Sequence, residues 1–236
     1  MDLKIKDVAE LLSVSETTIR RWLMEGKIPA YRLNHQYRFS RIEIENWMMS
    51  CKLEPEQIYP VQEEQESSLS RAGTQQFSLF RAIHKGEVLT NVAGETKEEI
   101  FQCCMKSIAP LLGMDAELLT ELLLDREHLM STALGGGIAV PHPREFIVKG
   151  AVDRVIVAFL KEPVDFGALD GLPVHTLFFL FSSQDKRHLH LLAKIAHLSS
   201  SPSQALQTLR GKQSKEDVLS FIKEWEGDLG SFKEKN

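Results

Sequence analysis

Two continuous apolar runs constrain the fold of this chain more than any other feature. Residues 155–160 are Val-Ile-Val-Ala-Phe-Leu and residues 177–181 are Leu-Phe-Phe-Leu-Phe, so neither run has a polar residue to turn toward water. Such runs are typical of strands that are buried on both faces. The predicted fold class is therefore α/β, a sheet with helices on both sides. Further strands are predicted at 87–92 and 138–140, and helices at 96–109, 115–124, 186–198, 203–209 and 214–225.

The run from Ser131 to His142 has the most distinctive local chemistry. Three consecutive glycines, residues 135–137, come shortly before His142, which stands between two prolines. Glycine lets another backbone come close and proline restricts the chain, so we expect the imidazole to be presented rather than packed. A neutral imidazole near pH 7 can attack a phosphoryl donor and hold the group as a phosphohistidine. The alternative is a glycine turn before a buried strand, which the histidine merely caps.

Neither nucleotide binding by the glycines nor metal binding by the histidines is predicted. No Gly-Lys-Ser or Gly-Lys-Thr follows the glycines, so they do not form a nucleotide loop. His188 and His190 are two positions apart, and on a helix they point about 200° apart, too far to share one ion easily. We predict no metal site and no cofactor.

The first 52 residues follow a different pattern. Apolar residues at helical spacing predict two short helices, with a break at residues 13–15 and a stop at Gly26. Asn34 and His35 then lie between two short segments that predict a hairpin, because asparagine tolerates a left-handed turn. A third helix follows from Ser40. This order is typical of a winged helix-turn-helix domain.

Positive charge gathers in this segment, although the whole chain has a formal net charge of -5. Positions 20–41 hold six lysines and arginines, and Glu25 is the one acidic residue among them. A local basic surface of this kind is a candidate footprint for a DNA backbone. The alternative is a helical docking module whose basic face is only solvated. We expect DNA contacts from the outer face of the second helix and from the wing, at Thr17, Thr18, Arg20, Arg21, Arg32 and Arg38.

Residues 53–76 separate the two patterns. They are rich in Glu, Gln and Ser and hold five acidic residues against one basic residue, which predicts a flexible acidic linker. The predicted organisation is a DNA-binding domain at 1–52, this linker, and an α/β domain at 77–236 that moves independently. No apolar run reaches the length of a membrane helix and the start has no signal-peptide pattern, so we predict a cytoplasmic protein without membrane insertion.

Five motifs of the α/β domain, in order, resemble the IIA phosphocarrier domain of the bacterial phosphotransferase system. They are residues 125–127 (Asp-Arg-Glu), 131–132 (Ser-Thr), 137–142 (Gly-Ile-Ala-Val-Pro-His), 170–174 (Asp-Gly-Leu-Pro-Val) and 188–193 (His-Leu-His-Leu-Leu-Ala). The resemblance is to the fructose/mannitol type, especially its nitrogen-regulatory branch. It implies a mixed sheet, a phosphohistidine at His142 formed from an HPr-like carrier protein, and assistance from His188 and Arg126. It also implies that the phosphate pocket is supported by Ser131, Thr132 and Gly137.

Residues 1 to about 50 resemble excisionase or MerR-like winged helix-turn-helix domains, which implies duplex DNA as a partner. We expect a homodimer on DNA, because a single small module offers few base contacts and paired half-sites are the usual solution. The resemblance rests on residues 8–12, 14–15, 18–22, 26–30 and 38–39 and on Trp47. The leading functional hypothesis is a regulator in which phosphorylation of His142 is coupled to DNA binding. The alternatives are a IIA component of sugar transport that passes phosphate to a IIB protein, and an interaction module that is never phosphorylated. A sensor kinase and an ion transporter are further candidate partners.

Overall fold

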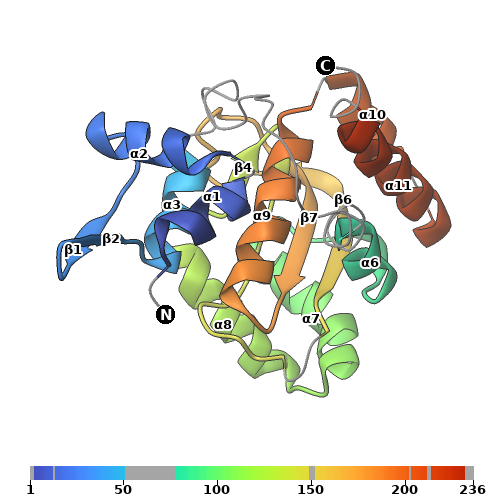
Figure 1. Cartoon of the computed structure of the whole chain (residues 1–236). Helices are drawn as coiled ribbons and strands as arrows, with labels where there is room; N and C mark the ends of the chain where they lie inside the picture. Colours follow the sequence, from blue (N-terminus) through green and yellow to red (C-terminus); the bar gives the residue numbers. More distant parts are fainter. Residues whose placement is uncertain are drawn as a thin grey trace.

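A computed structural model describes residues 3–12, 14–50, 78–148, 152–201, 203–211 and 214–231. The predicted linker at 53–76 lies outside the described residues. Figure 1 shows the N-terminal helices lying against one side of an α/β unit.

The N-terminal part has the predicted helix-turn-helix and wing. Its elements are α1 (Ile5–Leu12), α2 (Glu16–Met24), β1 (Tyr31–Leu33), β2 (Gln36–Arg38) and α3 (Arg41–Ser50). The Ser15 side chain caps α2 by accepting a hydrogen bond from the Thr18 backbone N–H. Asn34 and His35, with φ of 49° and 61°, both adopt the left-handed conformation that a two-residue hairpin turn requires.

The second part contains a five-stranded mixed sheet, which confirms the predicted fold class. Its strands lie in the order β3, β6, β7, β5, β4, with β3 parallel to β6 and β5 parallel to β7. The pairs β6–β7 and β4–β5 are antiparallel. The strand bounds are β3 (Val88–Val92), β4 (Ala133–Gly135), β5 (Ile138–Ala139), β6 (Arg154–Val164) and β7 (Val174–Phe181).

Helices cover both faces of this sheet, as the two apolar runs predicted. Alternate residues of β6 divide between two cores: Val155 and Val157 belong to one, and Ile156 and Ala158 to the other. The first core packs α6 (Ser78–His84), α9 (Asp185–Ser199), α10 (Ser203–Arg210) and α11 (Lys215–Ser231). The second core packs α7 (Lys97–Leu112) and α8 (Ala116–Leu129). The core of the N-terminal helices is continuous with the first one.

Some elements differ from the prediction. Helix α8 continues to Leu129 rather than ending at 124, and neither α6 nor β4 was expected. The short helix α6 depends on a distant partner, because the Glu226 carboxylate of α11 accepts hydrogen bonds from the backbone N–H groups of Leu79 and Phe80 at 3.1 and 2.9 Å. Local sequence carries no signal for such a cap.

Among the helices of the described residues, none combines the length and apolar character needed to cross a membrane.

Candidate functional site at the contact between the domains

His142 lies just after β5, where the Pro141 carbonyl ties the chain to β7 by accepting a hydrogen bond from the Leu180 N–H at 3.0 Å. Nδ1 of His142 lies 2.7 Å from the Val140 carbonyl oxygen. A carbonyl can only accept a hydrogen bond, so Nδ1 must carry the ring proton. In the neutral ring, Nε2 therefore holds the lone pair and is the nucleophilic nitrogen.

The three glycines before His142 all have positive φ, of 85°, 58° and 74°. The predicted close approach of another backbone occurs at Gly136, where an added Cβ would lie 2.6 Å from the Ser199 carbonyl oxygen. At Gly137 an added Cβ would lie 2.4 Å from the His175 ring. Both the backbone conformation and the space around this turn therefore require glycine.

The imidazole ring of His188, in α9, packs against that of His142. The two ring centroids lie 4.9 Å apart with an interplanar angle of 62°. Burial lowers the pKa of His188 below 6.5, and this effect outweighs the neighbouring carboxylate of Glu45. His190 is not part of this arrangement, because its Nε2 pairs with the Ser78 hydroxyl at 2.9 Å.

Arg126 is 2% exposed and lies in the last turn of α8. One guanidinium nitrogen donates to the Met130 carbonyl at 3.0 Å, so this arginine does cap its helix. The other terminal nitrogen donates to the Asn46 side-chain oxygen at 3.2 Å, across the domain contact. Burial lowers the pKa of Arg126, while Glu45 and Glu127 oppose that effect. An arginine still keeps its charge.

The hydroxyls of Ser131 and Thr132 are engaged within the α/β domain. Ser131 donates to the Phe166 carbonyl, and Thr132 donates to the Glu127 carboxylate at 2.6 Å. The Thr132 carbonyl also accepts a hydrogen bond from the Val140 N–H at 3.0 Å, which positions the strand leading to His142. A direct part for Ser131, Thr132 or Gly137 in a phosphate pocket stays a prediction.

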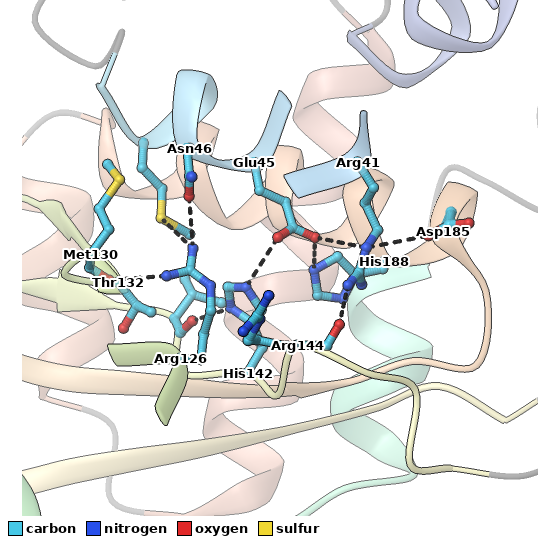
Figure 2. Close-up of polar contacts among 12 residues, drawn as sticks. Arg41, Glu45, Asn46, Arg126, Met130, Thr132, His142, Arg144, Asp185 and His188 are labelled. Carbon is cyan, nitrogen blue, oxygen red and sulfur yellow. Dashed lines mark hydrogen bonds and ion pairs between the residues drawn. The ribbon is translucent and has the colours of Figure 1, made fainter. Parts of the chain in front are cut away.

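The expectation that His142 is presented to solvent is wrong, because its side chain is 0% exposed. Helix α3 of the N-terminal domain covers it, and Figure 2 shows the Glu45 carboxylate pointing at both histidines. One Glu45 oxygen lies 3.5 Å from Nε2 of His142 and the other lies 2.9 Å from Nε2 of His188. Independent movement of the two domains was predicted from the linker, whereas the structure places them in close contact.

Glu45 is ionised in this position. Burial alone would raise its pKa, but the contacts with His142 and His188 hold the pKa well below 4.5. Nε of Arg41 adds positive charge 3.5 Å from the same carboxylate. No sequence signal marked Glu45, since a glutamate on a short helix is usually solvated.

Other charged contacts extend the interface along α9. Nε of Arg41 lies 3.3 Å from the Asp185 carboxylate, and its guanidinium also donates to the Arg144 carbonyl (Figure 2). The same guanidinium lies over the Phe146 ring. Lys186, the residue of α9 that follows Asp185, pairs with Asp7 of α1 at 2.6 Å. Helices α1 and α3 thus form the docking face of the N-terminal domain.

Glu45, His142 and His188 could in principle hold a metal ion, because their ligand atoms all lie within 4.8 Å of one another. Spacing along a helix relates His188 to His190 but not to His142 or Glu45, so no pattern in the sequence predicted this group. Two guanidinium groups interact with the Glu45 carboxylate. Nε of Arg41 lies 3.5 Å from it, and the positive charge of Arg126 attracts it electrostatically. A cation bound here would be repelled by these two guanidinium groups, whereas the oxygens of an anion would be attracted to them.

The residues predicted to face DNA lie mostly on the opposite side of the N-terminal domain. Figure 1 shows α2 and the β1–β2 hairpin directed away from the sheet, and the exposed residues there include Thr17, Arg20, Arg21 and Arg32, with Arg38 half-buried. The placement of Thr18 on the outer face is wrong. It is 5% exposed, and its hydroxyl pairs with that of Ser15 at 3.0 Å, because the cap of α2 turns this position inward.

Two known families match the chain. A helix-turn-helix domain matches residues 3–52, and the family "Phosphoenolpyruvate-dependent sugar phosphotransferase system, EIIA 2" matches residues 81–225, more than half of the chain. The chain belongs to this EIIA family. Both predicted resemblances are thereby confirmed, and the EIIA assignment supports a phosphocarrier-like role in the phosphotransferase system.

Relatives of this EIIA chain include two nitrogen regulatory proteins. The one from Pseudomonas aeruginosa is 40% identical over 121 residues, covering 50% of this chain and 77% of the relative. The one from Escherichia coli K12 is 31% identical over 153 residues, covering 63% and 91%. The crystal structure of IIA-Ntr from Neisseria meningitidis is similar with a TM-score of 0.52 and 30% identity, over 58% of this chain and 93% of that one.

Proposed function

We propose that this EIIA-family chain accepts a phosphoryl group on Nε2 of His142 from an HPr-like protein and couples its phosphorylation state to duplex DNA binding. The proposed phosphorylation of His142 is supported by the 2.7 Å contact between its Nδ1 and the Val140 carbonyl oxygen. This contact assigns the proton to Nδ1 and leaves the Nε2 lone pair directed toward His188 and the charged groups around it.

The transfer step needs no metal and no net proton movement. The Nε2 lone pair of His142 forms a bond to phosphorus as the N–P bond of the donor phosphohistidine breaks, and that electron pair stays on the donor ring. Arg126 supplies a permanent positive charge for the phosphoryl oxygens. His188 supplies a hydrogen-bond donor when its Nε2 carries the proton, and such donors stabilise charge that develops in transfer.

The DNA half rests on the exposed basic residues Arg20, Arg21 and Arg32 of α2 and the wing, and on the helix-turn-helix match over residues 3–52. Two relatives carry the name nitrogen regulatory protein, which favours a regulator over a sugar-transport relay. A helix-turn-helix domain on the same chain agrees with that preference.

Incubation of the full chain with Enzyme I, HPr and phosphoenolpyruvate, followed by intact mass measurement, tests the phosphoryl half. We expect the mass of one phosphoryl group to be added, and the modification to be lost in acid and absent from His142→Ala. His190→Ala is the matched control, because His190 pairs with Ser78 outside the site and should still be labelled. Labelling of His142→Ala would overturn the assignment, and rapid loss of label to an added IIB protein would favour the transport alternative.

A further inference from the structure

We propose that helix α3 is an intramolecular occupant of the phosphoryl site, in which the Glu45 carboxylate stands where the phosphoryl group on His142 would stand. Docking of the helix-turn-helix domain and phosphorylation of His142 then exclude each other. The phosphorylation half of this inference rests on the proposed function, whereas the docking half rests on the contacts alone.

Helix α3 leaves no space for a phosphoryl group on His142. A Glu45 oxygen lies 3.5 Å from Nε2 of His142, and a phosphorus atom bonded to Nε2 would need this volume for itself and its three oxygens. The His142 side chain is also 0% exposed. A donor protein therefore reaches Nε2 only after α3 has moved away.

The Glu45 carboxylate is chemically similar to the phosphoryl group whose place it takes. A carboxylate and a phosphoryl group are both anions that present oxygens to hydrogen-bond donors and cations. Glu45 directs one oxygen toward each histidine, at 3.5 and 2.9 Å, and Arg41 of its own helix lies beside it. The donors that would hold a phosphoryl group are thus facing a side-chain anion from the other domain.

Arg126 is occupied by the same helix. Its guanidinium donates to the Asn46 side-chain oxygen at 3.2 Å and lies 3.6 Å from the Met49 sulfur. Nε of Arg126 and Nε2 of His188 lack a hydrogen bond of good geometry within the described part of the chain. These buried donors are only partly satisfied by α3, so a phosphoryl group can compete for them.

A phosphoryl group bound to His142 would repel the docked carboxylate. Phosphoryl groups carry roughly two negative charges near neutral pH, and Glu45 is buried, with 1% exposure. Two such anions cannot share this volume, and coupling between two events is reciprocal. Docking therefore slows phosphorylation, and phosphorylation releases α3.

The docked state leaves the DNA face open. Docking uses α1 and α3, through Asp7, Arg41 and Glu45, whereas Arg20 and Arg21 of α2 remain exposed. Release of α3 therefore changes how the DNA-binding domain is held by the EIIA domain, and it does not uncover the α2 surface.

The test compares wild type with Glu45→Ala and Glu45→Gln, and Glu43→Ala is the matched control because Glu43 is exposed on the same helix. The first measurement is the rate at which diethyl pyrocarbonate modifies His142 in the full chain, with EDTA present. The second is the initial rate of phosphorylation by phospho-HPr. We expect Glu45→Ala to increase both rates by at least about tenfold, since it removes a buried charged contact. Glu45→Gln, which keeps the size of the side chain, should give a smaller increase, and Glu43→Ala none.

The two measurements separate this inference from the proposed function. Faster modification of His142 in Glu45→Ala without phosphorylation of any variant would support docking and overturn the phosphocarrier proposal. Equal modification and equal phosphorylation rates in wild type and Glu45→Ala would overturn docking and leave the phosphocarrier proposal standing. If EDTA by itself increased the rate of His142 modification in wild type, a metal ion would be holding the contact. That result would overturn the assignment of the site to an anion.

Discussion

The carboxylate of Glu45 lies 2.9 Å from Nε2 of His188, although the two residues belong to different domains. This contact makes a helix of the helix-turn-helix domain part of the site in the EIIA domain. Access to His142 therefore depends on where the N-terminal domain lies, and several of the following predictions depend on that arrangement.

Arg126→Ala and His188→Ala should slow phosphorylation of His142, because each removes a donor for the phosphoryl group. The measurement belongs in a Glu45→Ala background, since Arg126 also binds Asn46 of the docked helix and its loss would loosen docking. In that background we expect the initial rate to fall at least about tenfold. Arg126→Lys, which keeps the charge and loses the planar fork, should recover part of it. Undiminished rates would confine both residues to structural roles.

Gly137→Ala should destabilise the EIIA domain by about 2–4 kcal/mol. Alanine is strained in the left-handed backbone conformation of this position, and its Cβ would collide with the His175 ring. The φ of this residue is 74°, and the added atom would lie 2.4 Å from His175. Chemical denaturation measures the free energy of unfolding. Gly227→Ala is the control: no atom lies within 4 Å of its added Cβ, and alanine in a helix should stabilise by about 0.5–1 kcal/mol.

His175 should make the protein less stable at acid pH. Burial, together with the charge of Arg210, lowers its pKa from 6.5 to about 4. The unfolded chain therefore binds a proton at a higher pH than the folded chain does, so this stability is present above pH 6.5 and is lost as the pH falls toward 4. Allowing for partial solvent screening, we expect a loss of about 1–2 kcal/mol.

Denaturation curves of wild type and His175→Gln at neutral and acid pH measure this difference. The variant should show the smaller decrease in the free energy of unfolding between the two conditions, because it lacks the titrating ring. A decrease of equal size in both proteins would assign the acid sensitivity to other groups.

Arg20→Ala and Arg21→Ala should each weaken binding to all duplex sequences. Each should also reduce the slope of log affinity against log salt concentration by about one, because one fewer counterion is released. Both side chains are exposed on α2. Thr17→Ala should instead change sequence preference, if its hydroxyl reaches a base edge. Fluorescence anisotropy across a salt series measures these effects, and Lys223→Ala, an exposed residue of α11, is the control. An unchanged salt slope in the arginine variants would favour the docking-module alternative.

Phosphorylation should alter binding to DNA with two half-sites more than binding to a single half-site. The α2 face is already exposed in the docked state, so one module binds a single site equally well in either state. Two modules on one duplex must match a fixed spacing, and that match depends on whether α3 holds each module to its EIIA domain. Equal affinities of both states for the paired site would leave the two domains uncoupled.

The sequence by itself determined the elements whose causes are local. The apolar runs predicted the buried strands β6 and β7, the break at residues 13–15 predicted where α2 begins, and the helix expected at 96–109 corresponds to α7. The left-handed Asn34 was predictable for the same reason, because a turn is specified by its own residues. The glycines and prolines around His142 marked that histidine, whereas the roles of His188 and Arg126 were inferred from motifs that the family resemblance supplied.

Only the tertiary structure decided what surrounds those residues. Helix α6 forms where Glu226, distant in sequence, satisfies its first N–H groups. The burial of His142 depends on Glu45, which lies in the other domain and is separated from it by the segment at 53–76. Spacing and periodicity describe neighbours along a chain, whereas packing of one domain on another depends on the shape and charge of two finished surfaces.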